Sequence, residues 1–399
     1  MKITFVSNYI NHHQIPFCSA MYGLLGEDFR FIETQQMTQE RMALGWAEEA
    51  DMFAWCLFWD RNRQECEKLF LESDVVLLGW SLLPARLIEE RLSSGKITLR
   101  ITERIYKEGQ WKALSPRGLK NKYKEHIRYR KQPVYLLCAG AYVASDFALI
   151  HAYPEKRFRW GYFPPFVERK KTQWDDGDAA QRLRLCWAGR MIDWKHPEFA
   201  LMAARRLKEL EVDFTLDMVG DGPLRAALEK YAEKHELSFY VRFYKAVTPV
   251  ETRTVMEASH IFLFTSNHLE GWGAVVNEAM NSALAVVASE LAGSVPFLIE
   301  DGKNGLVYRR GSYADFERQL LRLVYDRALC ERLGRAAFAT IIREWNAHTA
   351  AGRMYAFCES LLKNGRPKDF SGTGPLSSAP VIRPPKSINK KEPNRQDHG

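Results

Sequence analysis

Two glutamates eight positions apart, Glu270 and Glu278, are the residues of this chain whose type and spacing best suit chemistry. They lie in TSNHLEGWGAVVNEAM, residues 265–280, and a Gly-Trp-Gly turn follows the first of them. Carboxylates accept hydrogen bonds from hydroxyl groups, and glycines let backbone N–H groups approach a phosphate closely. The stretch therefore suits a sugar beside a phosphate. For this pair alone, an acidic loop followed by an ordinary helix surface explains the pattern equally well.

The elements that must position these glutamates are a strand, a turn and a helix. The apolar residues 260–264 predict a buried strand, and the spacing of Ala, Val and Met after Gly273 predicts a helix. We expect Glu270 on the loop and Glu278 about one turn into the helix, both facing one cleft. The N–H groups at the start of this helix, with the positive end of its dipole, would suit a diphosphate.

Two cations, Arg190 and Lys195, form a second candidate element between the predicted strand 183–188 and a helix that starts at Pro197. A planar guanidinium and a compact ammonium can converge on a diphosphate. Alone, this element is better explained as surface charge, but the two glutamates in the same half of the chain favour a diphosphate site. The following strand ends in MVGDGP, where Gly220 permits a tight turn.

Candidates for binding a second substrate follow predicted strands of the first half. The loop SNYINHHQ, residues 7–14, offers Asn8, His12 and His13 to acceptor hydroxyls, and His13 is also a candidate for proton transfer. A solvated loop is the alternative. After the predicted strand 97–101, Glu103 is a second catalytic candidate and Arg104 a candidate acceptor contact. A local ion pair between these two residues is the alternative there.

The stretch from Glu270 to Met280 resembles E-G-x-G-x-x-x-x-E-A-M, the signature of retaining glycosyltransferases of the GT-B fold, family 4 (glycosyl transferases group 1). This resemblance implies that Glu270 contacts the donor sugar and Glu278 the ribose of its nucleotide. The Arg190–Lys195 spacing also resembles a family element. This resemblance implies that both cations bind the diphosphate and that they and Glu270 have a catalytic role. The implied donor site also includes Gly220, Gly271, Trp272, Gly273, Ala274 and Val275. The Gly-Gly pair that family members often carry in the first loop is absent.

The alternation of strand-like and helical runs predicts an α/β fold with parallel sheets. No GxGxxG follows the first strand, which disfavours a dinucleotide oxidoreductase. With the resemblance, we expect GT-B architecture, that is, two Rossmann-like doubly wound domains facing across a cleft. The expected divisions are an acceptor-side domain at 1–162, a linker at 163–180, a nucleotide-sugar domain at 181–345, a helix at 346–362 that crosses back, and a disordered basic tail at 363–399.

The composition bounds the class of protein. The chain has 399 residues, 46% of them hydrophobic and 27% charged, which is enough for two globular domains. Seven scattered cysteines without CxxC spacing favour a reducing cytosol over a disulfide framework or a zinc site. No apolar run has the length of a signal peptide or a membrane span, so we expect a cytoplasmic protein.

The net charge of +8 is concentrated in one segment, which we call the basic run. Between Arg104 and Lys131 there are ten Lys or Arg residues against two Glu, interleaved with aromatic and aliphatic residues. Such a segment suits an anionic membrane surface or a lipid-phosphate acceptor, and would then place the protein peripherally at the inner face of the membrane. A solvated basic face explains it equally well. Nucleic acid is disfavoured because no nucleic-acid module accompanies the run.

The resulting prediction is a retaining glycosyltransferase of the hexosyltransferase class. It would move a sugar from a UDP- or GDP-linked donor to a glycan or lipid-linked saccharide acceptor, in bacterial surface polysaccharide or glycan assembly. No cofactor is required, and no compact DxD-type element indicates a metal. Two alternatives stay open: a non-catalytic carbohydrate-binding or assembly protein, and a nucleotide-sugar epimerase of the same architecture.

Overall fold

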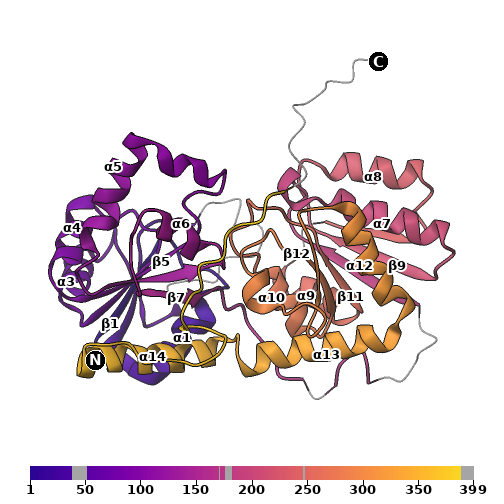
Figure 1. The fold of residues 1–399 in the computed structure, drawn as a ribbon. Coiled ribbons are helices and arrows are strands. Elements are labelled where there is room, and N and C mark those ends of the chain that lie inside the picture. The colour runs from indigo at the N-terminus through magenta and orange to yellow at the C-terminus, as the bar shows by residue number, and fades with distance from the viewer. Residues whose placement is uncertain (38–51, 170, 176–181, 246–247, 388–399) are drawn as a thin grey trace.

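The computed structural model describes residues 1–37, 52–169, 171–175, 182–245 and 248–387. Two α/β domains lie side by side, and the last long helix runs beneath the first of them (Figure 1). Residues 170 and 176–180 of the expected linker, and residues 388–399 of the expected tail, lie outside the described residues.

The first domain is built on a seven-stranded parallel sheet of order β3-β2-β1-β4-β5-β6-β7. Its strands are β1 Ile3–Ser7, β2 Phe29–Glu33, β3 Cys56–Phe58, β4 Val75–Leu78, β5 Ile97–Thr102, β6 Val134–Ala139 and β7 Arg157–Trp160. Its α-helices are α1 Ile15–Leu25, α3 Arg63–Glu72, α4 Ala85–Ser93, α5 Pro116–Glu125 and α6 Val143–Leu149, with 3₁₀ turns at Gly26–Asp28, Gln110–Leu114 and Ile127–Tyr129. The central strands β1, β4 and β6 are buried along their length, as apolar strands of a sheet covered on both faces must be.

The second domain has a six-stranded parallel sheet of order β10-β9-β8-β11-β12-β13. Its strands are β8 Leu183–Ala188, β9 Phe214–Val219, β10 Val241–Tyr244, β11 Ile261–Phe264, β12 Ala285–Ser289 and β13 Leu306–Tyr308. Its α-helices are α7 Glu198–Glu209, α8 Arg225–Lys234, α9 Pro249–Glu257, α10 Val275–Asn281, α11 Val295–Leu298, α12 Tyr313–Tyr325 and α13 Arg327–Arg343, and a 3₁₀ turn covers Asp193–Lys195. The parallel α/β class and the two doubly wound domains are confirmed.

Each sheet has one point at which its strand order reverses. In the first sheet β1 lies between β2 and β4, and in the second sheet β8 lies between β9 and β11. At such a switch point the loops after the two adjacent strands leave in opposite directions, which opens a crevice where ligands bind in α/β folds. The loops that follow β1, β4, β8 and β11 are therefore the positions where the fold prepares binding sites.

The last helix, α14 Ala347–Asn364, returns to the first domain and packs against α1 (Figure 1). The ring of Phe357 lies 4.8 Å from that of Phe158 and 6.2 Å from that of Tyr135. The two domains also meet directly, because the backbone N–H of Ala141 donates to the carbonyl of Gly293 at 2.8 Å.

The prediction that residues 363–399 are disordered is wrong for residues 373–382. Leu376 is fully buried, and Ser378 forms an antiparallel bridge with Phe158 of the edge strand β7. The N–H of Arg159 donates to the carbonyl of Ser377 at 2.8 Å, and the N–H of Leu376 donates to the carbonyl of Arg159 at 2.8 Å. We call residues 373–382 the strap. Its Pro- and Ser-rich composition predicted disorder, but the free edge of β7 supplies its hydrogen-bond partners.

Candidate active site

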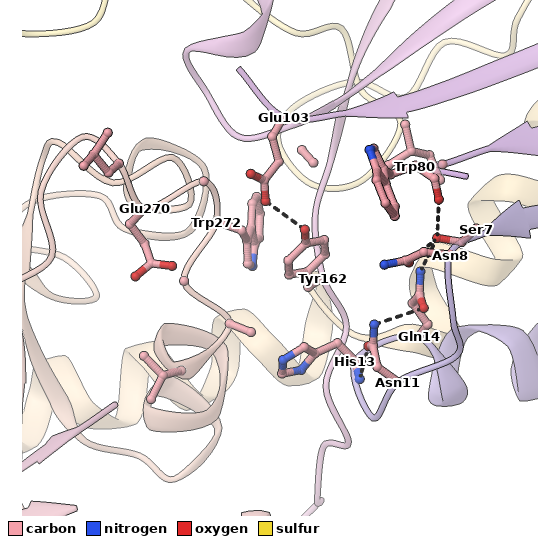
Figure 2. Close-up of a pocket in the computed structure, with 18 of the residues that line it drawn as sticks. Ser7, Asn8, Asn11, His13, Gln14, Trp80, Glu103, Tyr162, Glu270 and Trp272 are labelled. Carbon is pink, nitrogen blue, oxygen red and sulfur yellow. Dashed lines mark hydrogen bonds between the residues drawn. The ribbon is translucent and has the colours of Figure 1, made fainter. Parts of the chain in front are cut away.

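A cleft of about 1640 Å³ lies between the domains and is lined by the loops at both switch points. Figure 2 shows the side chains of both sides around it, with Glu270 on the second domain facing Trp80, Asn8 and Gln14 on the first. All the predicted site residues line this cleft, from the first loop to Glu278. The expectation that Glu270 and Glu278 face one cleft is therefore met.

Glu270 and Lys195 form an ion pair at the second switch point. Lys195 Nζ lies 2.6 Å from Glu270 Oε2, and Ser266 Oγ donates to the same carboxylate oxygen at 3.1 Å. Thr265 Oγ1 donates to the backbone carbonyl of Lys195 at 2.5 Å, which ties the loops after β8 and β11 together. Glu270 Oε1 has no hydrogen-bond partner among the described residues and remains available to a ligand hydroxyl.

Arg190 is the exposed cation of this side of the cleft. Its guanidinium carbon lies 5.8 Å from the ring centre of Trp194, and no carboxylate of the described residues pairs with it. The loop beneath it is compact, since a Cβ at Gly220, where φ is +127°, would lie 2.1 Å from the carbonyl oxygen of Gly189. Gly220 thus allows the backbone after β9 to pack directly on the backbone after β8. The loop after β8 carries Arg190 and Lys195.

The Gly-Trp-Gly turn is shaped by contact with the first domain. A Cβ on Gly271 would lie 2.1 Å from a carboxylate oxygen of Glu103, and Gly273 has φ of +85°. Trp272 is 1% exposed, its indole N–H donates to Asn277 Oδ1 at 2.9 Å, and its ring lies 5.7 Å from that of Trp345. The indole is therefore part of the core between the domains, which the sequence alone did not distinguish from a donor contact.

Glu278 lines the cleft from helix α10. Ala274 and Val275, at the start of this helix, also line the cleft. Burial raises the pKa of the Glu278 carboxyl to about 7, an effect that the nearby Arg253 guanidinium partly opposes. At neutral pH the group is thus divided between the acid, which both donates and accepts, and the carboxylate.

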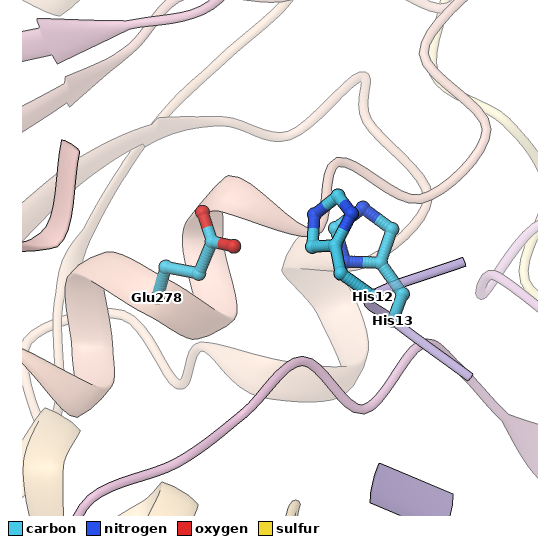
Figure 3. A group of neighbouring side chains, drawn as sticks. All are labelled: His12, His13 and Glu278. Carbon is cyan, nitrogen blue, oxygen red and sulfur yellow. The ribbon is translucent and has the colours of Figure 1, made fainter. Parts of the chain in front are cut away.

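His12 and His13 reach across from the first domain to Glu278 (Figure 3). One potential ligand atom from each of these three residues lies within 4.8 Å of the others, and they are the only such group among the described residues. Burial lowers the pKa of His12 to about 4 and that of His13 well below its usual range, with His12 lowering it further. Both imidazoles are therefore neutral at pH 7, able to bind hydroxyls or a divalent ion.

Glu103 and Arg104 each have other partners. Glu103 Oε1 accepts from the Tyr162 hydroxyl at 2.8 Å, and Lys107 Nζ lies 2.5 Å from Oε2. Arg104 Nη2 lies 3.2 Å from Asp146 Oδ1, with 7% of its side chain exposed. The alternative of an ion pair between Glu103 and Arg104 is therefore wrong. Glu103 has both oxygens occupied, and Arg104 is held by a buried carboxylate, so neither geometry favours direct contact with a substrate.

Several residues of the cleft escaped the sequence analysis. Tyr162, which stacks on His13 with ring centres 5.9 Å apart, is the last residue of the expected first domain. Trp80 follows β4 and is 62% exposed. No motif marks either residue. The usable signal was topological, because Trp80 follows the strand adjacent to β1 at the switch point.

The basic run forms the 3₁₀ turn Gln110–Leu114 and helix α5. Its exposed apolar side chains are Trp111, Leu114, Leu119 and Tyr123. Some of its cations are paired locally, as Lys122 is with Glu125 at 2.7 Å. None of the helices in the described part of the chain combines the length and apolar character that a membrane crossing requires.

Comparison with known proteins gives a family match over the second domain. Residues 168–340 match the model of the family described as glycosyl transferases group 1. A D-inositol 3-phosphate glycosyltransferase of Streptomyces bingchenggensis is 30% identical over 192 residues, which are 43% of this chain and 42% of that protein. The lipopolysaccharide core biosynthesis glycosyltransferase LpsE of Rhizobium meliloti is 30% identical over 158 residues, 40% of this chain and 44% of that protein. The chain thus spans less than half the length of these curated relatives.

Solved structures extend the likeness to both domains. The crystal structure of HepE from Anabaena in complex with UDP superposes with a TM-score of 0.67 and 15% identity, and covers 90% of this chain and all of that one. At this identity the likeness concerns the fold alone. The chain therefore has the GT-B fold, and its residues 168–340 match the glycosyl transferases group 1 family.

Proposed function

We propose that this protein is a glycosyltransferase that moves a sugar from a nucleotide-diphosphate sugar to a hydroxyl group of an acceptor, with retention at the anomeric carbon and without a metal ion. The observation that carries the proposal is the convergence of Arg190, Lys195, Glu270 and Glu278 on one side of the cleft, at the switch point of the second sheet. These groups match a diphosphate between two hydroxyl-bearing sugars. The UDP named in the HepE structure supports a nucleotide of this kind.

In the proposed reaction the bond between the anomeric carbon and the diphosphate oxygen breaks, and a bond to the acceptor oxygen forms on the same face of the sugar. The acceptor proton passes to an oxygen of the leaving diphosphate. Arg190 and Lys195 stabilise the negative charge that develops on this leaving group, which is where electrostatic stabilisation lowers the barrier most. Glu270 Oε1 accepts from a hydroxyl of the donor sugar, and Glu278 binds the ribose.

The position of His12 and His13 changes the role that we propose for them. From the sequence, both histidines and Asn8 were predicted to bind the acceptor. Their closeness to Glu278, within 4.8 Å, supports a contact with the donor nucleotide from the opposite domain. A donor held between these histidines and Glu278 would bridge the domains and favour closure, which excludes water from the reaction.

The donor site is tested by ligand-induced thermal stabilisation. UDP, GDP and ADP, and their common sugars, are compared on the wild type and on Glu278→Ala. We expect one nucleotide to raise the Tm of the wild type at concentrations well above its Kd, and the shift to be largely lost in the variant. The absence of a shift with every nucleotide would refute the donor site and favour a non-catalytic carbohydrate-binding protein. An altered nucleotide sugar formed without any acceptor would instead identify an epimerase.

Two finer parts of the proposal need separate measurements. The anomeric configuration of the product, read from its proton coupling constant by NMR, tests retention.

We also propose that the basic run holds the first domain at an anionic membrane, as suits surface glycan assembly, since its exposed Trp111 and Leu114 lie among cations. Reversing several of its charges should reduce binding to liposomes containing anionic lipid at low salt, and unchanged binding would refute this part.

A further inference from the structure

The switch point of the first sheet carries an aromatic side chain that the proposed mechanism does not use. Trp80 follows β4, which lies beside β1, and its side chain borders the cleft. It is 62% exposed, whereas Leu78, at the end of β4, and Leu83 are buried. An aromatic ring left open at the place where the fold forms a binding crevice indicates contact with a ligand.

Trp80 is held next to a network of amide and hydroxyl groups. The Ser7 hydroxyl lies 3.1 Å from Asn8 Oδ1 and 3.5 Å from the carbonyl oxygen of Trp80, and it accepts from Gln14 Nε2 at 3.4 Å. Asn11 Nδ2 in turn donates to Gln14 Oε1 at 3.1 Å. These contacts fix the ends of β1 and β4 relative to each other, as Figure 2 shows.

Gly79 makes this arrangement possible. A Cβ at this position would lie 3.0 Å from Ser7 Oγ and 3.3 Å from the carbonyl oxygen of Val6, so a larger residue would have to displace the Ser7 hydroxyl. Within the described residues, no group accepts a hydrogen bond from Asn8 Nδ2. The cleft therefore presents an aromatic face next to an amide with unused donors.

This pairing matches the two faces of a pyranose. A sugar ring has a C–H face, which packs on an aromatic ring, and an edge of hydroxyl groups, which pair with amides. A lipid phosphate would instead require free cations at this point. Of the cations on this side of the cleft, Arg104, Lys107 and Lys122 are paired with carboxylates, and Arg100 donates to the backbone carbonyl of Glu125 and to the Tyr153 hydroxyl. The donor site lies on the other domain, so the first domain is where an acceptor would bind.

We propose that Trp80 is the platform on which a sugar ring of the acceptor packs, with Asn8 binding its hydroxyls, so that the acceptor is a saccharide. This inference rests on the proposed function in one respect. The bound saccharide is called an acceptor because the proposed donor site lies on the second domain. The platform itself predicts saccharide binding whether or not transfer occurs.

The test uses saturation-transfer difference NMR on the full chain with a panel of methyl pyranosides, in the presence of UDP. We expect at least one glycoside to give ring-proton signals with the wild type, and these signals to fall at least threefold in Trp80→Ala and to return in Trp80→Phe. Trp111→Ala is the matched control, because Trp111 is 70% exposed but lies outside the cleft. Its signals should equal those of the wild type.

The outcomes separate this inference from the proposed function. Equal glycoside signals in the wild type and Trp80→Ala, or no signal from any glycoside, would overturn the platform. A failure of UDP, GDP and ADP alike to stabilise the wild type would refute the donor site instead. UDP stabilisation should be the same in all four proteins, since Trp80 does not belong to the donor side, and a loss confined to Trp80→Ala would assign the ring to the nucleotide and also overturn the inference.

Discussion

Replacing Glu278 with Gln should stabilise the protein without ligand at alkaline pH and leave its stability almost unchanged in acid. The reason is the burial that raises the pKa of this carboxyl to about 7. A raised carboxyl pKa means that the folded state disfavours the charged form, so ionisation costs stability as pH rises from the unfolded-state pKa towards the folded-state pKa. Glutamine has nearly the same shape and no charge, and is free of this cost.

The magnitude follows from the two pKa values. A rise from 4.5 to about 7 corresponds to about 3 kcal/mol at full strength. Because Glu278 is partly open to the cleft, solvent screening reduces this, and we expect a gain of about 1 to 3 kcal/mol above pH 7. At pH 5 only a small part of the cost is present, so the gain should be well under half of that at pH 8.

The assay is urea unfolding of the wild type and Glu278→Gln at pH 5 and pH 8. Glu90→Gln is the control, since Glu90 is exposed on α4 and the substitution should have the same small effect at both pH values. An equal change in the free energy of unfolding for Glu278→Gln at both pH values would refute the reasoning. The pKa of the Glu278 carboxyl would then not be raised in the folded state.

Three further predictions concern other parts of the molecule. Lys195→Ala should lower kcat by about 10²- to 10³-fold, measured by release of the nucleotide diphosphate, and an unchanged kcat would remove Lys195 from leaving-group stabilisation. Because His12, His13 and Glu278 can together hold a divalent ion, Zn²⁺ should inhibit sugar transfer in competition with the donor. EDTA should leave this activity intact, and inhibition by EDTA would contradict metal-independent transfer. Leu376→Ala in the strap should destabilise the protein by about 2 to 5 kcal/mol in urea unfolding, whereas Val381→Ala, at an exposed position, should have little effect.

The residues of the proposed donor side could be predicted from the sequence because they lie in two short segments of the chain. Glu270 and Glu278 lie within one strand-turn-helix unit, and Arg190 and Lys195 within another, so spacing along the sequence approximates spacing in the cleft. The indole of Trp272 shows the limit of this approach. A tryptophan inside a signature is not distinguishable by type from a ligand contact, and only the packing against Trp345 assigns it to the core.

The proposed acceptor side was harder to predict from the sequence because its residues follow separate strands. Trp80 and Tyr162 lie more than 80 residues apart in the sequence, and both line the cleft because of the strand order of the sheet. The three-residue strands β3 and β13 were missed because such short apolar runs give no periodicity. The strap was predicted as disordered because its order depends on a partner strand that composition does not report.

The return of α14 and the strap to the first domain has a consequence for the order in which this protein is made. Residues 1–160 leave the ribosome first, yet their sheet keeps an open edge at β7 until Ser378 has been synthesised. Phe357, which packs against Tyr135 and Phe158, also arrives late. The second domain contains its own strands and helices within residues 183–343. The half of the protein that is translated first is therefore the half that completes its folding last.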